Sequence, residues 1–361
     1  MVNDALPEEW AILRGWLPPD LDQKARDLGF LQRARGLTDS ERWLRLILMH
    51  VAGGLSLEQA VVRAEELGIA QVSAVALFKR LRNAEAWLRE LCEHIVAEQQ
   101  RRLGLGSWPG QYRVRAIDAT DVQEPGSTGS EWRLHYSIRL PELVCDHYEV
   151  TDSTGGEKLG RFVFSPGELV LADRGYSHRA GAAQVLNSGA ELLLRWNHAV
   201  FPLEVNGRKF DVLSKLRRLS AKATGDWAVQ FRHAGKLYNL RLCAVRKNRV
   251  AADRARRKAL RKAQRNGTDP QPGSLELTEY ILVLTSLPAS FSARDVLELY
   301  RCRWQVELAF KRLKSLLSSG HVPKSDDRSA RAWMQGKLLT ALLVERLLLD
   351  ARVFSPWGYP L

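Results

Sequence analysis

The stretch Tyr300-Arg-Cys-Arg303-Trp-Gln-Val-Glu307-Leu-Ala-Phe-Lys-Arg-Leu-Lys314 combines one glutamate with side chains that bind phosphate. A helix turns about 100° per residue, so four of its residues would fall within a stripe about 60° wide. These four are Tyr300, Arg303, Glu307 and Lys314. A solvated helix face with weak ion pairs has the same spacing, so the stretch alone leaves both interpretations open.

Two apolar segments upstream each lead into an aspartate. The alternation in residues 112–117 predicts a strand that delivers Asp118 at its carboxyl end. A second strand, residues 169–172, leads into Asp173, and Gly175 can take the tight turn that follows. A single aspartate at a strand end is often only a turn former. Two of them, followed by the glutamate of the first stretch, favour a joint carboxylate site.

This set of residues resembles the DDE transposases of the fourth insertion-sequence family, whose hallmark is Y-x-x-R-x-x-x-E-x-x-x-x-x-x-K. All four hallmark positions match, at Tyr300, Arg303, Glu307 and Lys314. The segments Gly155-Gly-Glu157 and Asp173-Arg-Gly-Tyr176 resemble the family's second-aspartate region, and Ala119 stands where glycine is common. The resemblance covers roughly residues 110 to 345.

Composition points to a nucleic-acid partner. The chain has 361 residues, 45% of them hydrophobic and 26% charged, as in an ordinary globular protein. Lys and Arg number 54 against 41 Asp and Glu, and the net charge of +13 indicates a polyanionic partner. No stretch approaches the ~20 apolar residues of a membrane span, and no signal peptide is recognisable. We therefore expect a cytoplasmic, nucleoid-associated protein with no membrane partner.

The cysteines and histidines form no metal-binding pattern. Cys92, Cys145, Cys243 and Cys302 are scattered, which argues against a disulfide framework or a zinc cluster. His178 lies five residues after Asp173, and we expect it to start a helix rather than to join the site.

Residues 1 to about 105 have the pattern of successive helices. Thr38-Asp-Ser-Glu41 predicts a capping box before one helix, and Ser56 opens another that stops at Gly68. A third helix, residues 71–82, has a basic end, which is the outline of a helix-turn-helix DNA reader. The basic residues are Lys79, Arg80 and Arg82, and simple packing within a helical bundle remains the alternative.

After a Gly- and Pro-rich linker at residues 103–110, strands and helices alternate, which predicts an α/β core. About 130 residues separate Asp173 from Glu307, so a β-rich subdomain is expected within residues 200–276. Its end carries eleven positive charges between Arg241 and Arg265 against Asp253 alone, which favours contact with DNA phosphates over a solvated helix. The residues proposed for this contact are Arg254, Arg256, Arg257, Lys258, Arg261 and Lys262.

The family resemblance identifies the α/β core as a ribonuclease-H-like mixed sheet with a β-rich insertion and an N-terminal all-α domain. The expected division is a helical DNA-binding domain at 1–108, core at 109–199 and 277–352, the insertion with its basic segment at 200–276, and a tail at 353–361.

Three carboxylates without histidine or cysteine fit Mg²⁺, with Mn²⁺ as a substitute, and not zinc. Two ions roughly 4 Å apart can activate a water and stabilise the leaving oxygen of a phosphodiester. Asp118 would bridge both ions, while Asp173 and Glu307 each complete one. Arg303 and Lys314 would hold DNA phosphates, and Tyr300 would hydrogen-bond one near the cleaved end.

The resemblance implies a transposase that binds double-stranded DNA, both its terminal inverted repeats and its target, as a homodimer in the synaptic complex. A nuclease that cuts without joining and a non-catalytic DNA-binding regulator are the alternatives. Relatives can form a hairpin at the element end, with an aromatic residue of the insertion stacking on a flipped base. Trp227 is the candidate for this stacking, with a core role as the alternative.

Overall fold

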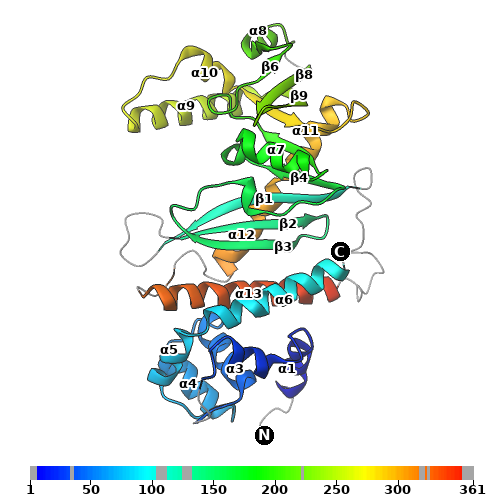
Figure 1. The fold of residues 1–361 in the computed structure, drawn as a ribbon. Coiled ribbons are helices and arrows are strands. Elements are labelled where there is room, and N and C mark those ends of the chain that lie inside the picture. Colours follow the sequence, from blue (N-terminus) through cyan, green and yellow to red (C-terminus); the bar gives the residue numbers. More distant parts are fainter. Residues whose placement is uncertain are drawn as a thin grey trace. The chain divides into compact units, whose positions relative to one another are not determined.

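A computed structural model describes residues 6–32, 36–102, 112–123, 132–220, 223–316, 322 and 326–351. The chain divides into two compact units (Figure 1). One comprises Met1–Gly104, Ala119–Gly155 and Leu308–Leu361, and the other comprises Leu105–Asp118 and Gly156–Glu307. We call them the helical unit and the sheet unit. The predicted linker at 103–110 and tail at 353–361 lie outside the described residues.

The helical unit confirms the predicted N-terminal helices. They are α1 (Leu6–Gly15), α2 (Leu21–Asp27), α3 (Ser40–Val51), α4 (Leu57–Glu66), α5 (Ala74–Leu81) and α6 (Glu85–Arg102). The capping box predicted before α3 is wrong, because Asp39 is the N-cap and accepts from the backbone N–H of Arg42. A capping box does open α4, where Ser56 and Gln59 bond each other's backbone N–H groups.

The remaining elements of the helical unit are two antiparallel strands and a long helix. These are β2 (Trp132–Leu140), β3 (Val144–Asp152) and α13 (Asp327–Ala351), and α13 packs against α6 and β3. Helix α13 contains the Leu-rich apolar run between Ser329 and Asp350. The side chains that it buries include Trp333, Leu339 and Leu342.

A carboxylate of α13 is partly buried against the two strands. The Tyr136 hydroxyl donates to Glu345 Oε1 over 2.9 Å, and the backbone N–H of Cys145 donates to Oε2 over 2.8 Å. Burial raises the pKa of Glu345 to about 7, against the lowering effect of these two hydrogen bonds. Since the pKa in the folded protein exceeds the ordinary 4.5, this group stabilises the fold fully below pH 4.5 and loses that contribution as pH rises through 7.

We therefore predict that Glu345→Gln flattens the dependence of stability on pH between about 4.5 and 7. The wild-type free energy of unfolding should fall by roughly 2 kcal/mol more than that of the variant, less than the full 1.36 kcal/mol per pKa unit because solvent reaches part of the side chain. Urea unfolding at pH 5 and pH 8 measures this difference. Glu93→Gln, at an exposed position of α6, is the matched control, and equal slopes for wild type and Glu345→Gln would contradict the prediction.

The sheet unit is a mixed sheet covered by helices. Its hydrogen-bonded strand order is β1-β4-β5-β10-β9-β8-β6-β7. The strands are β1 (Arg113–Val122, through Asp118), β4 (Glu168–Ala172), β5 (Glu191–Arg195), β6 (Glu204–Val205), β7 (Arg208–Lys209), β8 (Thr224–His233), β9 (Lys236–Arg246) and β10 (Tyr280–Thr285). Strands β1, β4 and β5 are parallel, whereas β10, β9 and β8 are antiparallel to their neighbours.

The helices of this unit are α7 (Arg179–Asn187), α8 (Val212–Arg217), α9 (Arg249–Arg265), α10 (Pro272–Leu277), α11 (Ala293–Arg301) and the first turn of α12 (Trp304–Leu316). Two 3₁₀ turns, Leu159–Arg161 and Arg174–Tyr176, complete it. Residues 169–172 of β4 have no exposed surface, which explains their continuous apolar run. The mixed α/β fold and the predicted β-rich insertion are thus present.

Two local predictions are wrong. Strand β1 does not end at Asp118 but continues to Val122, so this aspartate lies within the strand. The stretch from Tyr300 to Lys314 is not one helix, because α11 ends at Arg301 and α12 begins at Trp304. The chain turns at Cys302 and Arg303, which the helical periodicity of the flanking residues does not reveal.

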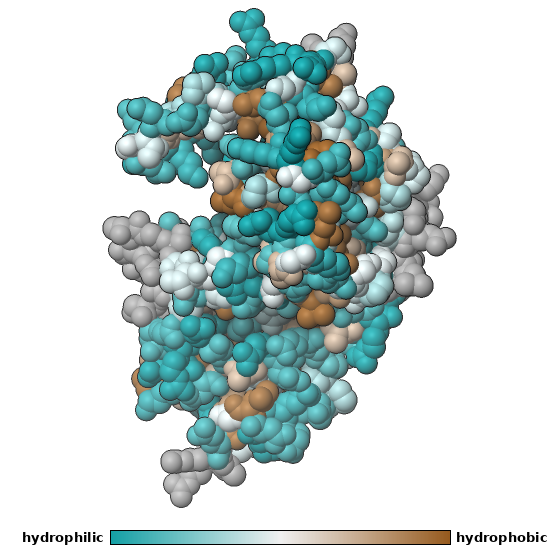
Figure 2. Space-filling view, turned by 45° about the horizontal axis from the view of Figure 1, so that its top comes forward, coloured by the Kyte–Doolittle hydropathy of each residue, from teal (hydrophilic) through white to brown (hydrophobic). Residues whose placement is uncertain are grey.

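The face of the molecule drawn in Figure 2 is mostly polar. Figure 2 shows hydrophilic residues over most of the viewed face, with hydrophobic residues in small separate patches. Among the described helices, none combines the length and the apolar character needed to cross a membrane. The four cysteines are free thiols, and all but Cys302 are buried.

Candidate active site

The register between β1 and β4 brings two aspartates side by side. These parallel strands pair from Arg113↔Glu168 to Ile117↔Ala172. The next residues along the two strands are Asp118 and Asp173. Neighbouring strands lie about 4.8 Å apart, so the two aspartates leave the same edge of the ladder as neighbours.

The turn between α11 and α12 brings the glutamate to this pair. The Arg303 guanidinium donates from Nη1 to Asp118 Oδ2 over 3.1 Å and from Nη2 to Glu307 Oε1. Only 11% of the Arg303 side chain is exposed, compared with 50% for Glu307. The fixed fork of a guanidinium can join two carboxylates at once, so Arg303 connects two of the three predicted carboxylates.

The third carboxylate is linked to the same group through Tyr300. The Tyr300 hydroxyl donates to Asp173 Oδ1 over 3.4 Å, and the Arg303 guanidinium lies 5.9 Å from the Tyr300 ring centre. Burial, and then the charge of Asp173, raises the pKa of Tyr300 above its usual range. Burial alone would lower the pKa of Arg303, but Tyr300 and the surrounding carboxylates raise it. Both groups therefore stay protonated and act as donors.

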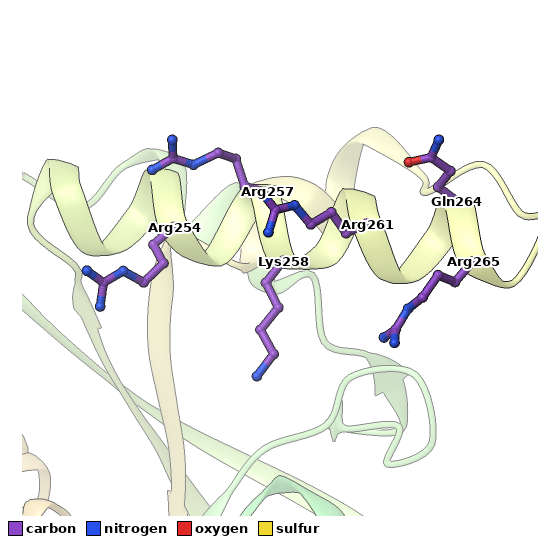
Figure 3. Close-up of a pocket in the computed structure, with 6 residues that line it drawn as sticks. All are labelled: Arg254, Arg257, Lys258, Arg261, Gln264 and Arg265. Carbon is purple, nitrogen blue, oxygen red and sulfur yellow. The ribbon is translucent and has the colours of Figure 1, made fainter. Parts of the chain in front are cut away.

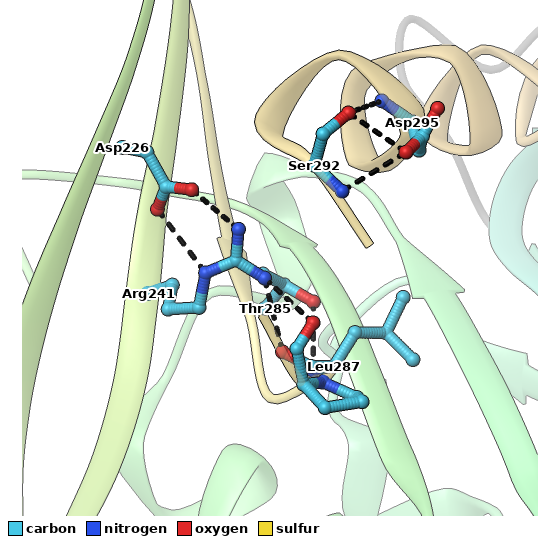
Figure 4. Close-up of polar contacts among 7 residues, drawn as sticks. Asp226, Arg241, Thr285, Leu287, Ser292 and Asp295 are labelled. Carbon is cyan, nitrogen blue, oxygen red and sulfur yellow. Dashed lines mark hydrogen bonds and ion pairs between the residues drawn. The ribbon is translucent and has the colours of Figure 1, made fainter. Parts of the chain in front are cut away.

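Helix α11 is fixed at its start by polar contacts (Figure 4). Ser292 and Asp295 form a capping box, and each accepts from the backbone N–H of the other. Just before it, Arg241 pairs with Asp226 and donates to the carbonyls of Leu287 and Pro288. These contacts hold the helix that carries Tyr300.

The loop after Asp173 packs closely on another acidic residue. A Cβ at position 175 would clash with Glu157 Oε2, so only glycine allows this carboxylate to approach Gly175. Glu157 belongs to the Gly155-Gly-Glu157 segment, which resembles part of the family's second-aspartate region. The joint occurrence of this segment and Asp173-Arg-Gly-Tyr176 therefore has a structural basis in this contact.

Comparison with known proteins agrees with this geometry. Residues 109–343 match the family model of the transposase DDE domain. The chain is 35% identical over 348 residues to the putative transposase InsL for insertion sequence element IS186A of Escherichia coli strain K12, covering 94% of this chain and 93% of that protein. It is also 35% identical over 349 residues to the transposase for insertion sequence element IS421 of Escherichia coli, with the same coverage.

The chain belongs to the DDE transposase family. It is an insertion-sequence transposase, an enzyme of DNA cleavage and strand transfer. Its fold is similar to that of a piggyBac transposase solved by cryo-EM as a synaptic complex with hairpin DNA, with a TM-score of 0.48 and 10% identity over 92% of this chain and 71% of that one.

The donor set of the transposase fits a divalent metal. Among the described residues, no three Asp, Glu, His or Cys side chains close on a single point as ligands of one ion. The cationic guanidinium of Arg303 is nevertheless held by Asp118 and Glu307 together, and Asp173 is next to Asp118 in the register. Carboxylate oxygens that hold one cation are the ligands that Mg²⁺ and Mn²⁺ prefer.

The predicted phosphate ligand Lys314 lies in the helical unit. It is an exposed residue of α12, seven positions after Glu307, and lines a small apolar pocket with Trp333, Met334 and Lys337. Its role in phosphate binding stays a prediction.

Two of the three basic residues predicted to read DNA make internal contacts in the transposase. Arg80 donates to the carbonyl of Phe30 over 2.7 Å, and Arg82 forms a bidentate pair with Asp326 at 3.1 Å. Lys79 is exposed at the end of α5. The contacts of Arg80 and Arg82 are of the packing kind, which was the alternative to DNA binding in the sequence analysis. Lys79 is the residue of the three that is most accessible to DNA.

The basic run divides into two parts in the structure. Arg241 and Arg246 lie in β9 and form ion pairs with Asp226 and Glu279, respectively. We therefore no longer count them among the basic residues available to DNA. Lys247 follows β9, and the rest forms α9, which has no buried residue. Figure 3 shows the side chains of this helix around a hollow of the surface, which is lined by Arg254, Arg257, Lys258, Arg261, Gln264 and Arg265.

Trp227 and His178 occupy structural positions. The Trp227 ring is partly buried, lies over Gly225 and is 6.2 Å from the ring of Phe210. The sequence left two roles open for Trp227, base stacking and packing in the core, and these contacts are of the second kind. His178 is the residue before α7, as expected, and its side chain makes no capping hydrogen bond.

Three cations that act on one another were not assigned to a common site from the sequence. They are Arg174, Arg195 and Lys247, which come from three separate segments of the chain. The position of Arg174 directly after Asp173 was a signal for one of them. Lys247 belonged to the basic run, and its grouping with Arg195 could be found only from the strand pairing.

Proposed function

We propose that Asp118, Asp173 and Glu307 hold two Mg²⁺ ions, for which Mn²⁺ can substitute, and that the transposase cuts and joins double-stranded DNA at this site. The proposal is supported by two features taken together. The β1–β4 register makes Asp118 and Asp173 neighbours, and Arg303 contacts both Asp118 and Glu307. When bound, the two ions would activate water and stabilise the leaving oxygen.

The protein's own residues position the DNA. Arg303 can present its planar fork to a phosphate, Tyr300 can donate a hydrogen bond near the cleaved end, and Lys314 can supply a point charge. The substrates are terminal inverted repeats and target DNA in the cytoplasm at the nucleoid, bound by a homodimer in the synaptic complex. The regions predicted from the sequence keep their roles, with DNA binding in the helices of 1–108 and in the insertion of 200–276.

A cleavage and joining assay tests this function. Duplexes that carry the element ends are incubated with Mg²⁺, Mn²⁺ or EDTA, together with a plasmid target. We expect nicking and then joined product with either metal and no product in EDTA. Nicking without joining would identify a nuclease, and DNA binding without any cut would identify a regulator.

Helix α9 should bind phosphates distant from the chemistry. We predict that replacing Arg254, Arg257, Lys258 and Arg261 by glutamine weakens DNA binding and flattens its salt dependence by roughly 0.9 for each phosphate that the helix no longer neutralises. No side chain of α9 is buried, so the fold should persist. Fluorescence anisotropy of a labelled duplex over a range of salt concentrations gives the slope. A slope equal to that of the wild type would assign this helix to a solvated face.

The same proposal covers Arg256 and Lys262, which lie on α9 outside the lined hollow.

The base-stacking role of Trp227 is a separate prediction, tested by loss of hairpin product without loss of the first nick in Trp227→Ala.

A further inference from the structure

We propose that Arg174, Arg195 and Lys247 form a binding site for one backbone phosphate of DNA, beside the carboxylates of the sheet unit. The inference rests on the proposed function and adds to it a phosphate site that neither the hallmark residues nor α9 supplies.

Three segments bring these cations to the start of β10. Lys247 follows β9 and donates from Nζ to the carbonyl of Thr278 over 2.5 Å. Arg195 ends β5 and donates to the carbonyl of Tyr280 over 3.5 Å. Because β10 lies between β5 and β9 in the sheet, both side chains reach the same end of this strand.

Arg174 joins the group from the loop after Asp173. Its Nη2 donates to Asn197 Oδ1 over 3.1 Å, and Asn197 lies two residues beyond the end of β5. Asn197 is itself held by the Ser177 hydroxyl, which accepts from its backbone N–H over 3.0 Å. Arg174 and the second aspartate therefore share one loop, and Asn197 links this loop to the end of β5.

The three cations donate these hydrogen bonds to neutral oxygens, whereas a neighbouring cation has an acidic partner. Arg246, one residue before Lys247, pairs with Glu279 at 2.9 Å. Burial, followed by the positive charges of Arg195 and Arg174, lowers the pKa of Lys247 to about 8. The charges that act on Lys247 are those of Arg195 and Arg174, so the cluster concentrates positive charge at this residue.

Such a group suits a phosphate. Two planar guanidinium forks and one ammonium match the several oxygens of a phosphate group, and the polyanion would relieve the repulsion among the cations. The charge of Arg195 also acts on the Tyr300 hydroxyl, which donates to Asp173. A phosphate bound here would lie along the DNA strand that the carboxylates process, so DNA is the source that we favour over free phosphate.

Binding of a short duplex of arbitrary sequence, measured by fluorescence anisotropy in EDTA at several salt concentrations, tests this site. Lys247→Met should weaken binding and lower the slope of log affinity against log salt by about 0.9. Arg246→Met removes the same charge one residue away and should keep the wild-type slope, since its partner is Glu279.

Thermal melting separates binding from a structural role. Without DNA, Lys247→Met should melt at or above the wild-type temperature, because it relieves repulsion. A lower melting temperature together with an unchanged salt slope would overturn the proposal. The proposal would also be overturned if inorganic phosphate, at matched ionic strength, raised the wild-type melting temperature as much as the duplex does. A wild-type protein that binds no DNA would instead overturn the proposed function.

Discussion

Replacing Asp118, Asp173 or Glu307 by alanine should lower DNA cleavage by at least about 10³-fold while DNA binding survives. Each carboxylate is expected to hold a metal ion that supplies several kcal/mol of transition-state stabilisation, and 1.36 kcal/mol corresponds to a factor of ten in rate. Affinity for DNA comes from dispersed phosphate contacts and should change little. A nicking assay in Mg²⁺ beside a gel shift in EDTA measures both quantities.

Asp269→Ala is the matched control for these variants. Asp269 is an exposed carboxylate of the same unit, in the loop after α9. The control should nick at the native rate. Native nicking by any of the three site variants would remove that residue from the site.

Arg303→Ala should lower cleavage by about 10²-fold or more, in the range measured when one preorganised donor is removed from an active site. The variant also loses the group that joins Asp118 to Glu307, so these two carboxylates would repel each other in the DNA-free protein. Arg303→Lys should not restore the rate, because an ammonium cannot reproduce the two-pronged contact. Single-turnover nicking at saturating protein measures the effect apart from binding.

Arg301→Ala provides the control for Arg303. Arg301 lies two residues earlier, is exposed and pairs with Glu298 of its own helix. Its loss should leave cleavage unchanged. Equal losses in the Arg301 and Arg303 variants would point to a general effect of charge rather than to the geometry of the site.

The helical N-terminal region, the strands that lead into the two aspartates and the helix after Asp173 were all predictable from the sequence. Their signals are local, since hydrophobic period and turn residues decide them. A helix was expected to start at His178, and α7 begins at the next residue, Arg179. The division of Tyr300–Lys314 into two helices was not predictable, because both halves have helical periodicity and no Gly or Pro marks the turn.

The partners of charged residues also depend on tertiary structure. Arg82 pairs with Asp326, 244 residues away, and Arg241 pairs with Asp226 across β8 and β9. Neither pair has a spacing that a sequence pattern could reveal. The hallmark residues were recognisable from their spacing as candidates for phosphate binding, whereas the cluster containing Lys247 required the order of the strands.

The number of Mn²⁺ ions bound to the transposase on a short duplex tests the metal site most directly. It is obtained from the electron paramagnetic resonance signal of the free ion, for wild type and for Asp118→Asn, which keeps the shape of the side chain and removes its charge. We predict about two ions per wild-type chain and clearly weaker binding by the variant. The same number of ions bound with the same affinity by Asp118→Asn would contradict a metal site built on Asp118, Asp173 and Glu307.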